Sequence, residues 1–390
     1  MPSEITLDRH DERDLTEKLA ARLPEIAAEA AANDEHATLP EAQLRWLSSA
    51  GFDAALLPEH LGGGGSSFGF FGHVVRSLAA SDPALATVWV MHVGAGVGLA
   101  ELTAQTLPGF FARAVLAGDR FANALSEPSS GNRFLNPQQE AEAVLGGYVI
   151  HGAKRFVSGS EIADHLLVNV AIGGEPAFFG IEPDPTVTLT PIWDSLGLRG
   201  TRSQLLGFDG TFLPAERRGL AGVLPRNLVG AGLPGISLGI ASATLAALVA
   251  HARGRTILGR PLAEQQWVLF AAAEQHSHLE AATEYWAAAL AAGDEGRSDF
   301  NDRLLRAKFL ANRVAVSVAE LAVRVGGGSG FLRTSPIQRH LRDAQAGQLM
   351  AYSTEVLMGV IGRQVLGLDD EPEPADVADA AAASAERPRS

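Results

Sequence analysis

The chain contains no cysteine among its 390 residues. It therefore forms no disulfide, has no thiolate ligand for a metal and offers no cysteine nucleophile. An excess of positive charge is also missing, because 31 Lys and Arg stand against 45 Asp and Glu and the formal net charge is -14. A chain with this charge lacks the basic surface that binds nucleic acid, so we expect no nucleic-acid partner.

An apolar leader is missing as well, since the first residues read MPSEITLDRHDERD, and this favours a cytoplasmic location. One stretch without formal charge, residues 229–252, is long enough to cross a bilayer. It is interrupted by several Gly and by Pro234 and lies in a helical half of the chain. A buried helix of a bundle explains these properties better, so we predict no membrane span.

Hydrophobic periodicity changes twice along the chain. Residues 1–118 have the Ala-rich amphipathic pattern of helices, with one helix start predicted at Ser81-Asp82-Pro83. Residues 119–220 contain short alternating apolar segments bounded by Gly, Pro, Asn or Ser, which is typical of strands. Strands are predicted at 148–150 and 166–168, with a tight turn at Gly146-Gly147.

Helical periodicity returns in residues 221–368. The predicted helices cover 235–257, 262–292, 300–325 and 335–366. Four long helices of this kind indicate an antiparallel bundle. The tail 369–390 has little besides Ala, Pro and charge, so we expect it to be disordered.

Two segments of the β-rich part carry hydroxyl and aromatic residues in a distinctive order. They are Ser126-Glu127-Pro128 with Gly131, and Lys154-Arg155-Phe156-Val157-Ser158. Taken singly, they would be a Pro-Gly turn and a core strand. Together they resemble the Thr-Glu-Pro…Gly-Ser loop and the Lys-x-Trp-Ile-Thr strand of the acyl-CoA dehydrogenase family of flavoproteins. The resemblance implies flavin contacts from Leu125, Ser126, Gly131, Asn132, Phe156, Val157 and Ser158, with Asn132 replacing the usual Ser.

The helical half continues the resemblance. Arg255, Leu258 and Gln266 match an Arg-x-x-Phe-Gly…Gln pattern. Residues 324–330 match a Gln-x-x-Gly-Gly-x-Gly turn, and residues 342–343 match the Arg-Asp that follows this turn in the family. In the family the first pattern reaches the FAD of a neighbouring subunit, the Arg through charge-assisted hydrogen bonds to pyrophosphate. The resemblance therefore implies FAD as cofactor and a homodimer or homotetramer. The residues expected at the shared cofactor are Arg255, Leu258, Gln266, Arg324, Gly327 and Gly328.

The resemblance breaks at the catalytic base. A dehydrogenase of this family removes the α-proton of the thioester, in most members with the Glu of a Glu-Gly-Thr segment. Here Ala351 holds that position and Ser353 the Thr position, whereas a shift by one residue places Tyr352 at the base. In some members the base comes from an earlier helix, and that position falls on Val229, with Gly230 beside it. The catalytic residue is therefore not identified.

Three other residues remain as candidate bases. Glu355 lies four residues after Ala351, hence on the same face of a helix, although its position in the family belongs to a flavin contact. We expect Ser353 and Glu355 near FAD for that reason. His92 and Glu127 are further candidates that the sequence does not place.

Three patterns typical of other protein classes are discounted. Gly235-Ile236-Ser237-Leu238-Gly239 has the spacing of a serine-hydrolase elbow but lies in a helical run rather than after a strand. Gly62 to Gly65 is not followed by the Lys of a phosphate loop. His276 and His278 lie on different faces of a helix, so no metal site is predicted.

The expected fold has an N-terminal α-helical domain, a middle β-barrel domain and a C-terminal four-helix bundle. Three functions are weighed. The first is an FAD-dependent oxidoreductase acting on the CH–CH group of an acyl thioester, with the electron acceptor open. The second is a flavin-dependent monooxygenase or oxidase on the same scaffold, in which no α-proton need be removed. The third is a non-catalytic subunit that contributes FAD contacts to an active partner.

Overall fold

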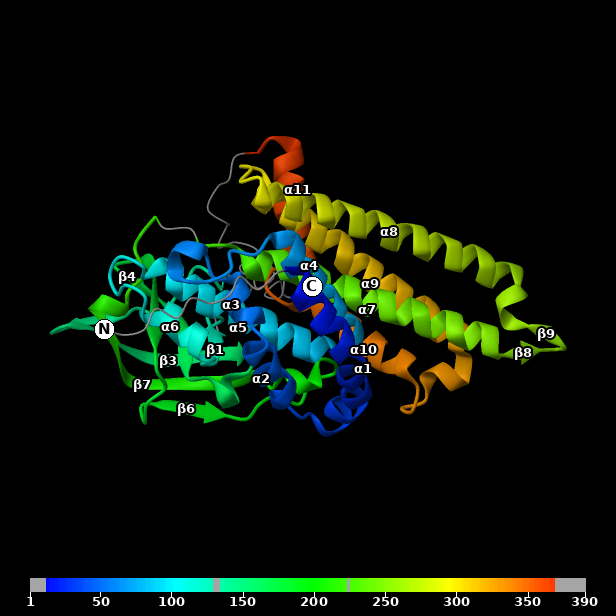
Figure 1. The fold of residues 1–390 in the computed structure, drawn as a ribbon, viewed down its shortest axis with the longest axis horizontal. Coiled ribbons are helices and arrows are strands. Elements are labelled where there is room, and N and C mark those ends of the chain that lie inside the picture. The colour runs from blue at the N-terminus through cyan, green and yellow to red at the C-terminus, as the bar shows by residue number, and fades with distance from the viewer. Residues whose placement is uncertain (1–11, 129–133, 223–224, 369–390) are drawn as a thin grey trace, which may run out of the picture.

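The computed structural model describes residues 12–128, 134–222 and 225–368 (Figure 1). Gly131, Asn132 and the tail 369–390 lie outside the described residues. In the described part, helices are followed by strands and then by helices again, as the periodicity predicts.

Helices make up the N-terminal part. They are α1 (Glu12–His36), α2 (Glu41–Ser49), α3 (Phe52–Leu56), α4 (Phe68–Ser81), α5 (Pro83–Leu102) and α6 (Phe110–Ala117). The predicted helix start at residues 81–83 is confirmed. The Asp82 side chain accepts hydrogen bonds from the backbone N–H groups of Ala84 and Leu85, and Pro83 is the first residue of α5.

The middle part consists of strands in two sheets. They are β1 (Phe121–Ala124), β2 (Glu142–Val144), β3 (Gly147–Val157), β4 (His165–Ile172), β5 (Glu175–Ile181), β6 (Val187–Thr190) and β7 (Gln204–Pro214). The sheet orders are β1-β4-β5 and β2-β3-β7-β6, and both sheets contribute to one apolar core. The predicted strands at 148–150 and 166–168 are confirmed, and Gly146 turns with a φ of 83°. Within the described residues, closure of the sheets into a barrel is not confirmed.

The C-terminal part is a bundle. It contains α7 (Leu228–Gly254), the short hairpin β8 (Thr256–Ile257) and β9 (Arg260–Pro261), α8 (Gln266–Asp294), α9 (Phe300–Phe331), α10 (Pro336–Leu349) and α11 (Thr354–Leu366). The prediction of one helix over 335–366 is wrong. The chain leaves the helix at Met350, which has a ψ of 139°, and Ala351 has a φ of 47° before Ser353 caps α11. Ala351 and Glu355 therefore do not share a helix face.

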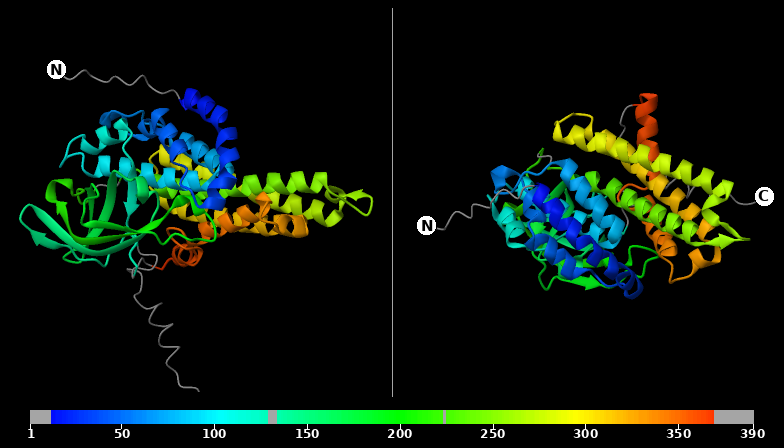
Figure 2. Two further views of the ribbon diagram at one scale, coloured as in Figure 1. Left: turned by 90° about the horizontal axis from the view of Figure 1, so that it is seen from below. Right: turned by 45° about the vertical axis from the view of Figure 1, so that its right-hand side comes forward.

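Figure 2 shows the bundle extending beyond the sheets and the N-terminal helices. The Gly-rich α7 lies at the centre and packs against α4, α5, α9 and α10. A Cβ atom at Gly235 would come within 2.7 Å of the Trp286 ring, and one at Gly239 within 2.7 Å of the Arg76 carbonyl oxygen. The small residues of α7 are therefore required by close packing between helices.

Three described helices, α5, α7 and α9, are long and apolar enough to cross a membrane. Their most apolar windows are 83%, 61% and 50% buried within the fold. Packing against neighbouring elements thus accounts for much of their apolar character. The absence of a membrane span stays a prediction.

A buried polar cluster joins α3 and α5 to β1. Asp53 accepts a hydrogen bond from the Trp89 indole N–H at 2.7 Å and lies 2.9 Å from Nε2 of His92. The other ring nitrogen of His92, Nδ1, accepts the backbone N–H of Phe121 at 2.9 Å. Nε2 must therefore carry the hydrogen and donate it to Asp53. Burial and the nearby Arg120 guanidinium lower the pKa of His92, so this ring is held neutral.

We predict that His92 makes the free energy of unfolding depend on pH. Because its folded pKa is lowered, the unfolded chain binds a proton below about pH 6.5 that the folded chain refuses. Stability is then lost as the pH falls from 6.5 toward 5, with a slope from this residue of up to about 1.4 kcal/mol per pH unit. Urea unfolding of His92→Gln should lack this part of the slope. His73→Gln, a change at an exposed histidine, should keep it; an unchanged slope in His92→Gln would contradict the assignment.

Candidate cofactor site

The two segments expected to contact the flavin lie side by side. Leu125 and Ser126 directly follow β1, whereas Phe156 and Val157 end β3 and Ser158 comes next. The backbone N–H of Arg155 donates to the Ser126 carbonyl oxygen at 2.8 Å. Leu125, Ser126 and Ser158 are half-buried, and Val157 is buried in the core of the sheets. Val157 can therefore offer only its backbone to a ligand.

A buried ion pair holds these segments together. The Lys154 ammonium lies 2.7 Å from a Glu127 carboxylate oxygen, and neither side chain is exposed. Glu127 also accepts the backbone N–H groups of Gln138 at 2.8 Å and Gln139 at 3.2 Å. Lys154 donates further to Asn169 Oδ1 at 3.0 Å. Both carboxylate oxygens of Glu127 are thus engaged in structural contacts, so Glu127 is no longer a candidate base. His92 is excluded in the same way, because its two ring nitrogens contact Asp53 and the Phe121 N–H.

A β-bulge exposes the aromatic ring of this site. The register between β3 and β7 shifts between Lys154 and Val157. Within the shift, Phe156 has a φ of 60° and its side chain is 48% exposed. A left-handed backbone is costly for an aromatic residue, and such strain is typical of functional positions. The Arg155 guanidinium lies 4.0 Å from the centre of the Phe156 ring, and the Trp193 ring lies 6.1 Å from it.

These residues fit an isoalloxazine ring. A flat aromatic cofactor needs an apolar surface against its face and hydrogen-bonding groups along its polar edge. The exposed Phe156 ring provides the surface; Ser158 lies two residues after it, and Ser126 is hydrogen-bonded to Arg155 just before it. Sequence reasoning did not predict the bulge, because no Gly or Pro marks it.

The remaining expected cofactor residues lie elsewhere. Arg255, Leu258 and Gln266 belong to the hairpin β8–β9 and the start of α8, and Arg324, Gly327 and Gly328 to the end of α9. Leu258 is 99% exposed at the hairpin tip with a φ of 48°, and Arg255 donates to Ser329 Oγ at 3.1 Å. This end of the bundle is opposite the β3 and β7 sheet (Figure 1). One chain therefore does not bring both groups of residues to one site.

The loop between α10 and α11 carries the expected position of the base. Ala351 is half-buried, and the Tyr352 ring centre lies 5.2 Å from that of Phe134. Ser353 is buried and caps α11 by accepting the Val356 N–H at 3.4 Å. Glu355 is exposed in the first turn of α11. Residues 350–354, Met-Ala-Tyr-Ser-Thr, contain no carboxylate.

A cluster that sequence reasoning missed supports this loop. Lys308 Nζ donates to the carbonyl oxygens of Gly347 at 3.0 Å and Tyr352 at 2.9 Å, one on each side of the helix break. Asn312 Nδ2 donates to the same Gly347 oxygen at 2.6 Å, and its Oδ1 accepts Ser237 Oγ–H at 2.9 Å. Burial lowers the pKa of Lys308 to about 8. The available signal was a lysine among the apolar residues of 307–315.

The Arg-Asp of residues 342–343 fastens the bundle to the middle part. Asp343 is buried and accepts the backbone N–H of Leu198 at 2.7 Å. Arg342 donates to the Leu196 carbonyl oxygen at 2.8 Å and to Asp34 of α1 at 2.9 Å. Burial raises the pKa of Asp343 to about 7. The motif therefore connects three parts of the chain through residues distant in sequence.

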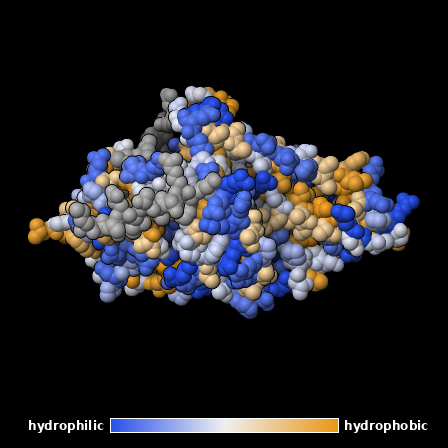
Figure 3. All heavy atoms as spheres, viewed as in Figure 1, coloured by the Kyte–Doolittle hydropathy of each residue, from blue (hydrophilic) through white to orange (hydrophobic). Residues whose placement is uncertain are grey.

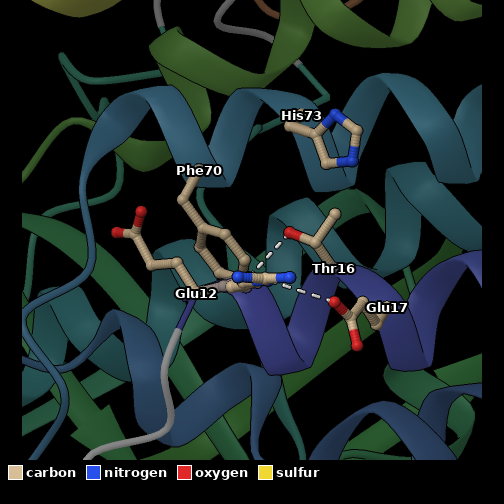
Figure 4. Close-up of a pocket in the computed structure, with 6 residues that line it drawn as sticks. Glu12, Thr16, Glu17, Phe70 and His73 are labelled. Atoms are coloured by element: carbon tan, nitrogen blue, oxygen red, sulfur yellow. Dashed lines mark hydrogen bonds and ion pairs between the residues drawn. The ribbon is translucent and has the colours of Figure 1, made fainter.

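Two cavities add little to this site. The larger, about 370 Å³, is an open groove where Glu12, Thr16 and Glu17 of α1 face Phe70 and His73 of α4 (Figure 4). None of the expected cofactor residues lines it. The smaller lies beside Ser237, Lys308, Asn312 and Asp343, and its volume of about 10 Å³ suits a single water molecule.

Comparison with known proteins gives consistent matches over nearly the whole chain. Residues 9–111 match the N-terminal domain and residues 231–366 the C-terminal domain of acyl-CoA dehydrogenase. A benzylmalonyl-CoA dehydrogenase of Aromatoleum aromaticum is 29% identical over 377 residues, covering 93% of this chain and 100% of that protein. The structure of butyryl-CoA dehydrogenase from Megasphaera elsdenii is 26% identical with a TM-score of 0.81, covering 92% and 99%.

A third similar protein differs in its ligands. A structure of KijD3 in complex with FMN and a dTDP-linked sugar is 25% identical with a TM-score of 0.80, covering 93% of this chain and 95% of that one. Together these matches show that the chain belongs to the acyl-CoA dehydrogenase family of FAD-dependent oxidoreductases.

We predict that Glu127→Gln destabilises the fold by about 3–5 kcal/mol, because it leaves the Lys154 ammonium buried without a counter-charge. Adding Lys154→Met to this variant should recover part of the loss, which gives a coupling energy in a double-mutant cycle of urea unfolding. Glu182→Gln, which removes an ion pair with Arg217 that is half-exposed on the Glu182 side, should change stability by less than about 1 kcal/mol. Additive effects of the two buried changes would count against the role given to the pair.

Proposed function

We propose that this FAD-dependent oxidoreductase oxidises the CH–CH group of an acyl thioester. The observation that carries the proposal is the strained, exposed Phe156 ring held beside Ser126 by the buried Glu127–Lys154 pair. The thioester is suggested by two similar proteins whose names specify CoA thioesters. When bound, FAD supplies a two-electron acceptor in this site.

In this proposal each part of the chain has a defined task. Phe156 packs against the flavin ring, Ser126 and Ser158 offer hydroxyl groups to its polar edge, and Leu125 and Val157 contribute backbone and apolar contacts. Ser353 and Glu355 lie near the cofactor at the start of α11. The residues assigned to the FAD of a second copy are Arg255, Leu258, Gln266, Arg324, Gly327 and Gly328.

We also propose that the chain forms a homodimer or homotetramer, because its two groups of cofactor residues lie at opposite ends of one copy. Large apolar side chains are exposed near the bundle end, and Figure 3 displays hydrophobic residues gathered there. They include Leu258, Trp267, Leu269, Phe270, Phe331 and Leu332, which are 46–99% exposed. Burying such a surface against a second copy would be favourable. We further propose a cytoplasmic location. The electron acceptor is not identified.

A second candidate function rests on the missing base. Ala351 and Val229 hold the two positions that supply the base in relatives, Glu355 is exposed, and Glu127 and His92 are occupied by other contacts. Such a site suits a flavin-dependent monooxygenase or oxidase, in which no α-proton is removed by the protein. The KijD3 structure, which holds FMN and a dTDP-linked sugar, shows that a similar protein binds a ligand other than a CoA thioester.

The test is Ala351→Glu, which returns a carboxylate to the loop. Because Ala351 already has a φ of 47° and Glu has the same backbone requirements, the loop should keep its shape. A positioned general base contributes about 10²- to 10⁴-fold. We therefore expect the anaerobic bleaching of bound FAD by acyl-CoA thioesters to become faster by up to that factor, measured by stopped-flow absorbance with detection of the enoyl product.

Ala351→Gln is the matched control and should bleach no faster than the wild type. Bleaching of the wild type by a thioester supports dehydrogenation with another proton acceptor. Bleaching only in Ala351→Glu means that thioesters bind but the native reaction needs no base, which favours the second candidate. Absence of bleaching in both proteins refutes the thioester, and activity only after addition of a second subunit would reveal a non-catalytic partner.

A further inference from the structure

Three hydroxyl groups form a hydrogen-bonded row that begins at Ser158, two residues after the exposed Phe156. Ser158 Oγ lies 2.8 Å from Ser203 Oγ, and Ser203 Oγ lies 2.8 Å from Thr201 Oγ1. Thr201 Oγ1 in turn lies 3.0 Å from the carbonyl oxygen of Leu198. Thr201 and Ser203 are buried, whereas Ser158 is half-buried at the open end of the row.

The hydrogen bond from Thr201 to the carbonyl group sets the direction of the other two bonds. A carbonyl oxygen can only accept, so the single hydrogen of the Thr201 hydroxyl is donated to Leu198. Ser203 must then donate its hydrogen to Thr201. Because the hydrogen of Ser203 is used, the contact with Ser158 requires the hydrogen of Ser158. The Ser158 oxygen is left with lone pairs only on its open side.

The residues around the closed end of the row are held by further hydrogen bonds. The Leu198 carbonyl oxygen also accepts the Thr201 N–H at 3.0 Å and the Trp193 indole N–H at 3.2 Å. The Leu198 N–H is bound by Asp343 of the bundle at 2.7 Å. Gly159, next to Ser158, donates its N–H to the Thr201 carbonyl oxygen at 3.1 Å. Both ends of the row therefore belong to a fixed backbone.

We infer that the Thr201–Ser203 pair makes Ser158 a hydrogen-bond acceptor toward the flavin and thereby favours the reduced cofactor over the oxidised one. This inference rests on the proposed function, in which Ser158 faces the polar edge of the flavin ring. The edge of the oxidised ring is rich in acceptor atoms, and reduction adds an N–H donor to it. Hydrogen bonds to ring nitrogens tune the cofactor's electronics. Thr201 and Ser203 are thus positioning residues that act through Ser158.

Ser203→Ala tests the inference, because it frees the hydrogen of Ser158 to turn toward the cofactor. The oxidised flavin then gains a donor. One neutral hydrogen bond corresponds to an affinity change of about three- to tenfold. The Kd for oxidised FAD should fall by that factor relative to the Kd for reduced FAD. A tenfold change corresponds to a midpoint potential about 30 mV lower for this two-electron couple. The potential is measured by anaerobic dye-linked titration of the holoprotein.

Two further variants separate this effect from a general loss of structure. Thr201→Val removes the acceptor of Ser203 and should lower the potential in the same direction, which keeps the test decisive if Ser203→Ala folds poorly. In a Ser158→Ala background, Ser203→Ala should have no further effect on the potential. Thr211→Val removes a different hydroxyl pair, that of the buried Thr211 with the half-buried Thr186 at 2.7 Å, and should leave the potential unchanged.

The outcomes are distinct. A lower potential in Ser203→Ala and Thr201→Val, absent from Thr211→Val, supports the inference. An unchanged or higher potential in variants that bind FAD overturns it while the proposed function stands. A wild-type protein that binds no FAD overturns the proposed function and this inference together.

Discussion

The buried pair of Glu127 and Lys154 is the interaction on which the cofactor site depends. It connects the segment after β1 with β3, two segments that belong to different sheets, and neither side chain reaches solvent. Burying two charges is seldom repaid in stability, even when the surrounding hydrogen bonds are complete. The value of the pair is therefore geometric. Lys154 stands where the register shift of the strand begins, and within that shift Phe156 is exposed with a left-handed backbone.

Features with strong local signals could be predicted from the sequence. The start of α5 follows from Asp82 and Pro83, because both act within one turn of the helix. The break between α10 and α11 could not be predicted, since residues 350–353 contain neither Gly nor Pro. That break is stabilised by Lys308, whose contacts with Gly347 and Tyr352 span 39 and 44 residues. The hydrophobic periodicity of a short segment gives no information about contacts between residues so far apart in sequence.

The sequence names the residues expected at the cofactor, but it does not say how they lie relative to one another. Their order along the chain pointed to Ser126, Phe156 and Ser158, and the structure brings the two segments that carry them together. The resemblance assigned Arg255 and its neighbours to the FAD of a second copy, and the hairpin β8–β9 next to Arg255 lies at the end of the molecule away from β3 and β7. The order along the chain passed over Thr201 and Ser203, because a buried hydroxyl in a loop has no distinctive spacing. Which hydroxyl donates in such a row can be worked out only when the positions of all its donors and acceptors are known.

The loop between α10 and α11 does not need a carboxylate at position 351, because side chains of α9 hold its backbone. Lys308 and Asn312 bind backbone carbonyl oxygens on both sides of Ala351 and make no demand on its side chain. The residue at this position can therefore change without refolding the loop. In the proposed site, the residues expected to hold the flavin are therefore separate from the position expected to supply a base. Similar proteins on this fold include dehydrogenases named for CoA thioesters and a protein whose structure holds FMN with a sugar nucleotide.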